Sequence, residues 1–351
     1  MMWSGVSNWP RQRTVRPAGG MRAALTIALA AAALLIAAPL SVATAQTSRC
    51  EIPEVATAAS SPAATEETAP TPVGAAIIQV EGQEGTPVTI AAPAPMATPI
   101  PPTPDPVATL TQELTAVSEA LAACLSTGDV ETVVELAGER YLGQMFGGSV
   151  PLSAEEYIAL ASQLTPTPTR ILTLEDVAPD GDDRATAIVT HVVGNQLMRA
   201  TWIFTQVDED DRADDESRWR LDGERQLEPS PPLDASPLGV EIGDLSFDLS
   251  ANTVAGPDVV LRGINVSAED HEMLVLRLDP GYTTADLLRA TGPDLPQEVT
   301  FVGERPVPAG EQADLVLVDL DPGDYTLVCL FTDPQGLPHL AQGMEAVFTV
   351  E

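Results

Sequence analysis

The chain has 351 residues, which is enough for two domains of ordinary size plus appended segments. It contains 17 basic residues, all of them Arg, against 51 acidic ones, which gives a formal net charge of −34. Because a strongly acidic chain is repelled by phosphate groups, we expect neither nucleic acid nor an anionic membrane surface as a partner.

Residues 1–45 are typical of an export signal. Four Arg precede the apolar run from Ala23 to Leu40, and the small residues Ala43 to Ala45 offer a cleavage site that would leave Gln46 first. The alternative is an uncleaved anchor, but Pro39 and the excess of Ala over Leu favour cleavage. We therefore expect a secreted or extracytoplasmic protein, in the periplasm or at the cell surface, that meets a membrane only if this segment is retained.

Export implies an oxidising compartment in which thiols tend to pair. The sequence contains three cysteines, Cys50, Cys124 and Cys329. Cys50 and Cys124 could form a disulfide, which would leave Cys329 as an unpaired thiol.

Residues 46–107 are rich in Pro, Ala, Thr and Glu. A segment with so few large apolar groups cannot offset its chain entropy by burial, and repeated prolines favour extended conformations. We predict a disordered linker over 46–107.

The next block changes from a helical to a strand period. Apolar residues recur at steps of three and four from Val107 to Leu125, a second helix is predicted after Asp129, and a third follows the capping box that begins at Ser153. The predicted strands cover 170–177, 185–193, 196–207 and 219–221, with an acidic loop at 208–217. Three helices followed by a meander predict an α+β domain over 108–228.

This order of elements, which ends in Trp219-Arg220-Leu221-Asp222, resembles the NTF2-like family, the superfamily of ketosteroid isomerase and SnoaL-like polyketide cyclases. The resemblance implies that the helices close a curved sheet into a cone. The residues that could line its mouth are Tyr157, Asp176, His191, Arg199 and Trp202. His191 alternates with Val189 and Val193, which favours a packed histidine, and no pair of residues has a spacing that identifies a catalytic base. We name no catalytic residue and leave enzymatic activity open.

A Pro-Ser-Pro-Pro sequence after Glu228 marks a domain boundary, and short strands separated by turns fill 235–351. They predict an antiparallel sandwich. The predicted strands are 239–249, 258–266, 272–278, 313–320, 325–330 and 345–350. An insertion at 281–310 contains a possible helix at 284–290.

Two stretches of this terminal block resemble the cupredoxins, the family of plastocyanin and azurin: Asn265 to His271, and Gly323 to Met344 with its Cys329 and His339. The resemblance implies an all-β Greek-key sandwich that binds copper through two imidazoles and one thiolate in a plane, with a weak axial thioether. Transferred to this chain, His271, Cys329 and His339 would be the equatorial metal ligands and Met344 the axial one.

The chain departs from the family in the loop that follows Cys329. Nine residues separate Cys329 from His339, more than in plastocyanin-like proteins, although the excess could fold into a turn at Pro334-Gln335-Gly336. A longer loop would hold its ligands less rigidly. In the alternative interpretation Cys329, Met344 and the histidines are ordinary packing residues of a metal-free sandwich.

The sequence thus predicts an exported copper-binding protein, acting in electron transfer or copper holding with an unknown redox partner. The alternative is a metal-free binding or adhesion protein that uses both domains as scaffolds, with an unknown small-molecule ligand. An enzyme that works through the NTF2-like cone is a third possibility.

Overall fold

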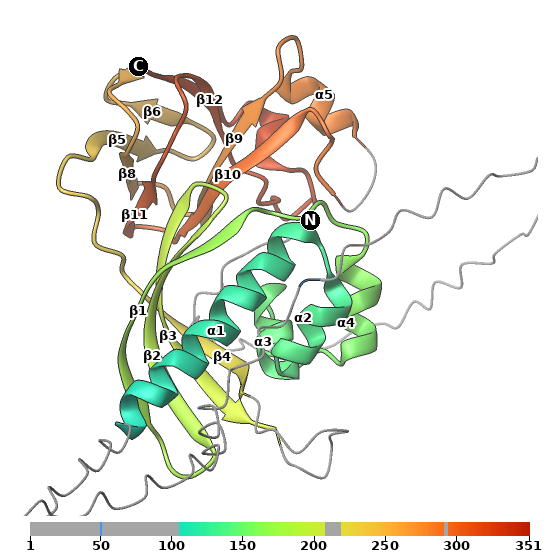
Figure 1. The fold of residues 1–351 in the computed structure, drawn as a ribbon. Helices are drawn as coiled ribbons and strands as arrows, with labels where there is room; N and C mark the ends of the chain where they lie inside the picture. The colour runs from blue at the N-terminus through green and yellow to red at the C-terminus, as the bar shows by residue number, and fades with distance from the viewer. Residues whose placement is uncertain (1–49, 51–104, 208–218, 291–293) are drawn as a thin grey trace, which may run out of the picture.

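A computed structural model describes residues 50, 105–207, 219–290 and 294–351 (Figure 1). The predicted signal at 1–45, almost all of the predicted linker and the acidic loop at 208–217 lie outside the described residues. Within the described part, no helix is both long enough and apolar enough to cross a membrane.

Side-chain caps set the boundaries of the predicted helices. Asp105 accepts a hydrogen bond from the amide of Val107 at the start of the first helix, and Gly128 ends it in the left-handed region at φ 74°. The carboxylate of Asp129 caps the second helix, and the predicted capping box of Ser153 and Glu156 opens another. These helices are α1 (Pro106–Thr127), α2 (Val130–Leu136) and α4 (Ala154–Ala161). The three predicted helices are confirmed.

A fourth helix of this block, α3 (Glu139–Met145), was not predicted. Its N-cap residue is Gly138, which makes no side-chain cap hydrogen bond, so the usual polar start signal is absent.

Helices α1, α2 and α3 pack on an antiparallel meander, with α1 lying across its strands, and α4 packs on α2 and α3 (Figure 1). The strands are β1 (Thr169–Pro179), β2 (Arg184–Val193), β3 (Gln196–Gln206) and β4 (Trp219–Leu227). Strand β4 continues six residues beyond the predicted end at Leu221. Leu114 and Leu121 of α1 meet Trp202 and Phe204 in one buried core. The arrangement is α+β, and the likeness to an NTF2-like cone stays a prediction.

The terminal block is a sandwich of two sheets around a second core. One sheet has the order β11-β8-β5-β6 and the other the order β10-β9-β12-β13-β7. The strands are β5 (Ser236–Ile242), β6 (Phe247–Leu249), β7 (Thr253–Val254), β8 (Val259–Asn265), β9 (His271–Leu278), β10 (Val299–Val307), β11 (Gln312–Leu317), β12 (Gly323–Val328) and β13 (Glu345–Val350). Alternate side chains of both sheets fill the space between them, including Leu238, Leu261, Val275, Leu327 and Phe348.

Three predictions about the sandwich need correction. The predicted strand at 239–249 is two strands, β5 and β6, which a turn closed by Gly243 and Ser246 connects. The insertion at 281–310 contains not only helix α5 (Thr284–Arg289) but also strand β10, whose Gly303 and Pro306 weaken the strand signal. Finally, β5 pairs with β8 and β13 with β7 in parallel, so the sandwich is mixed rather than antiparallel.

The two cores are joined through the turn between β2 and β3. Gln196 of β3 pairs with Leu317 of β11, which makes one sheet of the meander and half of the sandwich. The side-chain amide of Asn195 donates to the carbonyls of Val318 (2.9 Å) and Asp319 (3.1 Å). Domain limits at 108–228 and 235–351 stay a prediction, but the two halves share this hydrogen-bonded seam.

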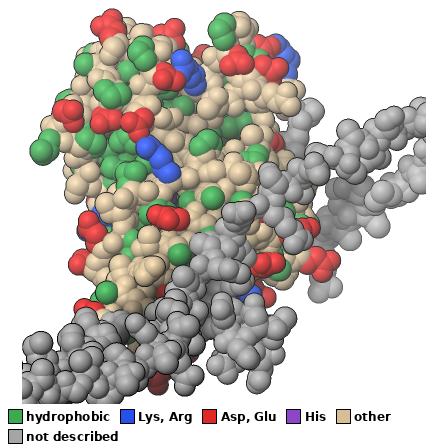
Figure 2. Space-filling model, in the orientation of Figure 1, with side chains coloured by type: hydrophobic (Ala, Val, Ile, Leu, Met, Phe, Trp, Pro, Cys, Tyr) green, Lys and Arg blue, Asp and Glu red, His purple; other side chains and the backbone are tan. Residues whose placement is uncertain are grey.

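On the face that Figure 2 shows, acidic side chains are spread over the described residues and basic ones are sparse.

Candidate metal centre

Three of the four predicted ligands lie at strand ends that the sandwich brings together, and His339 begins the 3-10 turn His339–Gln342. His271 begins β9, and Cys329 follows the last residue of β12. Because β9 and β12 are antiparallel neighbours, the start of one strand and the end of the other meet at the same edge. His339 and Met344 both lie in the segment that connects β12 with β13.

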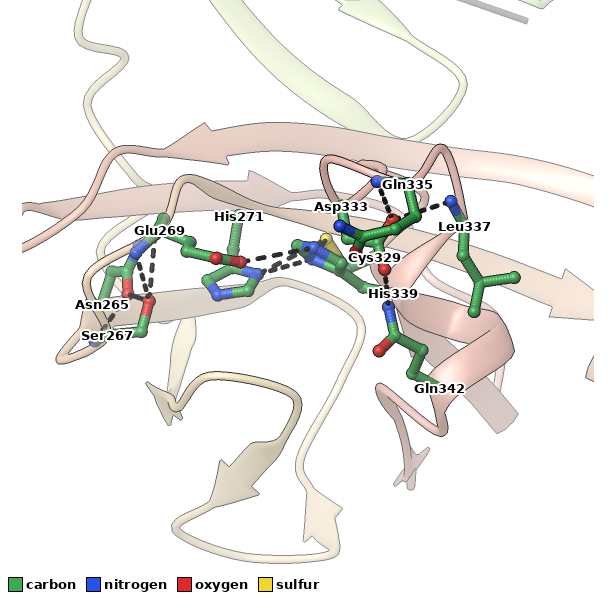
Figure 3. Close-up of polar contacts among 10 residues, drawn as sticks. All are labelled: Asn265, Ser267, Glu269, His271, Cys329, Asp333, Gln335, Leu337, His339 and Gln342. Atoms are coloured by element: carbon green, nitrogen blue, oxygen red, sulfur yellow. Dashed lines mark hydrogen bonds and ion pairs between the residues drawn. The ribbon is translucent and has the colours of Figure 1, made fainter.

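Three of the four side chains point toward one another (Figure 3). The sulfur of Cys329 lies 3.7 Å from Nδ1 of His271 and 3.5 Å from Nδ1 of His339, and the two Nδ1 atoms are 3.1 Å apart. The chain has only three histidines and three cysteines, and two of the former meet one of the latter here.

Two sides of this triangle of donor atoms have the lengths that a bound metal ion imposes. An ion held at about 2.0 Å from nitrogen and about 2.3 Å from sulfur, distances typical of zinc, separates donors in a plane by about 3.5 to 3.7 Å. Two of the three separations fall in that range, and the third, between the two Nδ1 atoms, is shorter at 3.1 Å. One thiolate with two imidazoles is the donor set of a type 1 copper site.

The site is sealed from water. Cys329 and His271 are 0% exposed, and His339 is 2% exposed. Burial raises the pKa of the Cys329 thiol to about 12, and the nearby Glu272 carboxylate adds to the rise, while amide hydrogen bonds from Glu272 and Phe331 oppose it. Without a metal the sulfur therefore keeps its proton at neutral pH, so metal binding must release that proton.

The outer ring nitrogens of the two histidines have different surroundings. Nε2 of His339 lies 3.7 Å from a carboxylate oxygen of Glu269. This separation is longer than a hydrogen bond, so the carboxylate acts on the imidazole through its charge. Nε2 of His271 is buried and has no hydrogen-bond partner among the described residues. Burial, followed by the neighbouring His339, lowers the pKa of His271.

A buried asparagine shapes the segment before His271. The side-chain amide of Asn265 donates to the carbonyls of Glu269 (2.8 Å) and Val307 (2.9 Å), while its oxygen accepts from the amide (3.0 Å) and the hydroxyl (2.8 Å) of Ser267. Asn265 is 2% exposed. It therefore fixes the turn that presents both Glu269 and His271.

The long loop after Cys329 is ordered by one carboxylate. Asp333 accepts from the amides of Gln335 (2.8 Å) and Leu337 (2.9 Å), and its second oxygen accepts from the side chain of Gln342 (3.1 Å). The excess residues fold into a turn, as predicted, with Gly336 in the left-handed region at φ 82°. Asp333 lies on one side of the ligands and Asn265 on the other (Figure 3).

Backbone hydrogen bonds tie the ligand positions to one another. The amide of Leu340 donates to the carbonyl of Cys329 (2.8 Å), and the amide of Met344 donates to the carbonyl of His339 (3.1 Å). Met344 is 0% exposed and packs in the same apolar cluster as Cys329. Its backbone is thus fixed beside the site, and its role as axial ligand stays a prediction.

The two-sheet sandwich and the three donors that converge at one edge agree with the resemblance found in the sequence. The terminal sandwich is cupredoxin-like. The buried His-Cys-His group at its edge is a candidate copper site.

The sequence matches no protein-family model and no curated protein. Among solved structures, an auracyanin from Roseiflexus castenholzii is 22% identical over 33% of this chain and 98% of its own, with a TM-score of 0.25. Auracyanin A, a "blue" copper protein from Chloroflexus aurantiacus, is 21% identical over 33% of this chain and 99% of its own, with a TM-score of 0.23. A multicopper oxidase from Campylobacter jejuni is 10% identical over 54% of this chain and 52% of its own, with a TM-score of 0.21. Likenesses at this level transfer no activity, so the copper assignment depends on the geometry of this chain.

Sequence reasoning missed the residues around the ligands of the cupredoxin-like sandwich. The contacts of Glu269 and Asp333 form only when the loops fold, so they could not be predicted. Asn265 lies in the stretch that resembles the cupredoxins, but its contacts were not predicted either. Glu272 was also missed, and it accepts from the amide of Leu330 at 2.8 Å. Burial raises the pKa of Glu272, and burial together with the Glu272 charge raises that of Glu304 to about 9.

The proposed cone-mouth residues of the middle block differ in burial. Tyr157 and Trp202 belong to one buried core, and His191 is buried beside Trp202, with ring centroids 5.3 Å apart. Asp176 is exposed and Arg199 is half-buried. Burial lowers the pKa of His191 to about 4, so it is a neutral, packed histidine at physiological pH.

Proposed function

We propose that this chain is an exported copper protein whose cupredoxin-like sandwich holds a type 1 copper ion for electron transfer or for copper storage. The observation that supports this most directly is the convergence of Cys329 Sγ, His271 Nδ1 and His339 Nδ1 in a buried triangle. Copper supplies a one-electron couple between Cu(I) and Cu(II).

The chain's own residues have distinct tasks in this proposal. Cys329 gives up its proton and offers the thiolate, while His271 and His339 present unprotonated Nδ1 atoms. Met344 would offer its thioether as a fourth, weak ligand, which would tune the reduction potential. The sealed apolar surroundings exclude water, so little solvent must reorganise when an electron arrives or leaves.

The signal-like residues 1–45 support an extracytoplasmic location. A surface with sparse positive charge favours a redox partner or copper donor with a basic docking face, because opposite charges steer association.

One observation favours a metal-free alternative. The two Nδ1 atoms lie at hydrogen-bonding distance, 3.1 Å, and the protonated Cys329 is close to both, so the three groups can satisfy one another without an ion. In that case the sandwich is a scaffold for binding or adhesion.

Titration of the full chain with Cu(II) separates the two functions. We expect intense visible absorption from thiolate-to-copper charge transfer at one copper per chain, and its complete loss in Cys329→Ser. Cys50→Ala and Cys124→Ala are matched controls that should keep the colour. Absence of colour in the wild-type chain, or colour that persists in Cys329→Ser, would refute copper binding at this site.

A further inference from the structure

The two cysteines outside the copper site lie close together. Cys124 is fully buried near the C-terminal end of α1, and Cys50 is half-buried. Both are free thiols in the structure, and their sulfur atoms lie within 4.8 Å of each other, although 74 positions separate them in the sequence.

Cys50 is held in this position by specific contacts. Its amide donates to a carboxylate oxygen of Asp129 at 2.8 Å, and its sulfur lies 3.1 Å from the hydroxyl of Thr127. Asp129 and Thr127 flank the end of α1, so they place the Cys50 thiol over the helix turn that contains Cys124. Cys50 also packs against the apolar core of the α+β block.

The third possible donor, Asp129, argues against a second metal site. One of its oxygens accepts from the amide of Thr132 (3.1 Å), and the other accepts from the Thr132 hydroxyl (2.7 Å) and from Cys50 (2.8 Å). These bonds cap helix α2 and occupy three of the roughly four lone-pair positions of the carboxylate, so Asp129 has little capacity left for a metal. What remains is a positioned pair of thiols.

We propose that Cys50 and Cys124 form a disulfide bond in the exported protein. The oxidant is a small or protein disulfide of the compartment, and the more exposed Cys50 reacts first to give a mixed disulfide and one released thiol. The Cys124 sulfur then displaces the second thiol. Two S–H bonds of the chain are lost, one S–S bond forms, and the oxidant's disulfide is reduced to two thiols.

The bridge has two consequences that do not depend on copper. It closes a covalent loop from residue 50 to residue 124, so the chain that enters the described structure at Cys50 is tied to α1. It also leaves Cys329 as the single free thiol, which prevents that residue from being lost to a wrong disulfide.

Peptide mapping tests the bridge directly. The full chain is treated with oxidised glutathione, alkylated without reductant, and cleaved after Arg and Glu. Cleavage at Arg49, Glu51, Glu119 and Glu131 would release a dipeptide with Cys50 joined to fragment 120–131 with Cys124. We expect this linked pair, its disappearance on reduction, and one titratable thiol in the unfolded chain. Three titratable thiols, or a linked pair that includes Cys329, would overturn the proposal.

A thermal shift distinguishes a structural bridge from an accidental one. Because a long closed loop restricts the unfolded chain, reductant should lower the Tm of the oxidised protein by roughly several degrees. Cys50→Ala should not respond to reductant, whereas Cys329→Ser should respond like the wild type even though it cannot bind copper. Equal responses of Cys50→Ala and the wild type would contradict the proposal. A Cd(II)-dependent rise in Tm of the reduced chain that requires Asp129 would replace it with a metal site.

Discussion

Glu269 and His339 meet at the outer side of the candidate copper site, where a carboxylate oxygen lies 3.7 Å from Nε2 of the imidazole. Glu269 is 56% exposed on its side chain, and His339 is almost completely buried. The Glu269 carboxylate thus lies between the buried His339 imidazole and the solvent. Its negative charge favours the more positive oxidation state of a bound ion.

Glu269→Gln should therefore raise the reduction potential of the copper-loaded protein. We expect an increase on the order of tens of millivolts, because a single partly exposed charge is lost near the site. Redox titration of the visible absorption measures the shift. Glu175→Gln, on strand β1 outside the sandwich, removes an equal charge and should leave the potential unchanged. An unchanged potential in Glu269→Gln would show that the carboxylate does not act on the site.

Asp333→Ala should loosen the loop that holds His339. The substitution removes three hydrogen bonds to one carboxylate, and the loop should lose roughly 1 to 3 kcal/mol of local stability. We expect faster release of copper to a chelator, with the circular dichroism of the fold retained. Gln335→Ala is the matched control, because only the backbone amide of Gln335 bonds to Asp333. Equal copper release rates in the two variants would contradict this role.

His191 should make the stability of the metal-free protein depend on pH. Its pKa falls from 6.5 to about 4 on folding, so between these values the unfolded chain binds a proton that the folded chain does not. Stability is fully present above pH 6.5 and decreases by about 1.4 kcal/mol per pH unit below it, or about 3 kcal/mol by pH 4.

Guanidinium unfolding at one-unit steps from pH 8 to pH 4 measures this dependence. His191→Gln should flatten the slope between pH 6.5 and 4 relative to the wild type, while at pH 7 and above the two slopes should coincide. Identical slopes over the acidic range would exclude His191 as their source.

The seam between the two cores gives a further prediction. Gln196 donates to the carbonyl of Glu304 (2.8 Å) and accepts from its amide (3.0 Å), and Asn195 makes the two bonds to the β11 end described above. The double variant Asn195→Ala, Gln196→Ala should cost roughly 1 to 3 kcal/mol and split thermal unfolding into two transitions. Calorimetry measures both effects. One cooperative transition at the wild-type temperature would show that the seam does not couple the cores.

Local signals in the sequence predicted local structure. The capping box at Ser153, the cap at Asp129 and the alternation in β2 and β3 identified their elements, because each depends on residues a few positions apart. Helix α3 and strand β10 were missed for the same reason: Gly138 offers no cap, and Gly303 and Pro306 disrupt the strand pattern. The sequence of a single strand does not reveal whether its partner in the sandwich runs parallel or antiparallel.

The order and types of the candidate ligands were determined by the sequence alone, since His271, Cys329, His339 and Met344 are visible in it without any structure. The convergence of the first three was decided by the tertiary structure, because only the pairing of β9 with β12 brings His271 to Cys329 across 58 positions. The same holds for Glu269 behind His339 and for Cys50 beside Cys124. Contacts between distant segments depend on how sheets and helices pack, and no local pattern of residues encodes that packing.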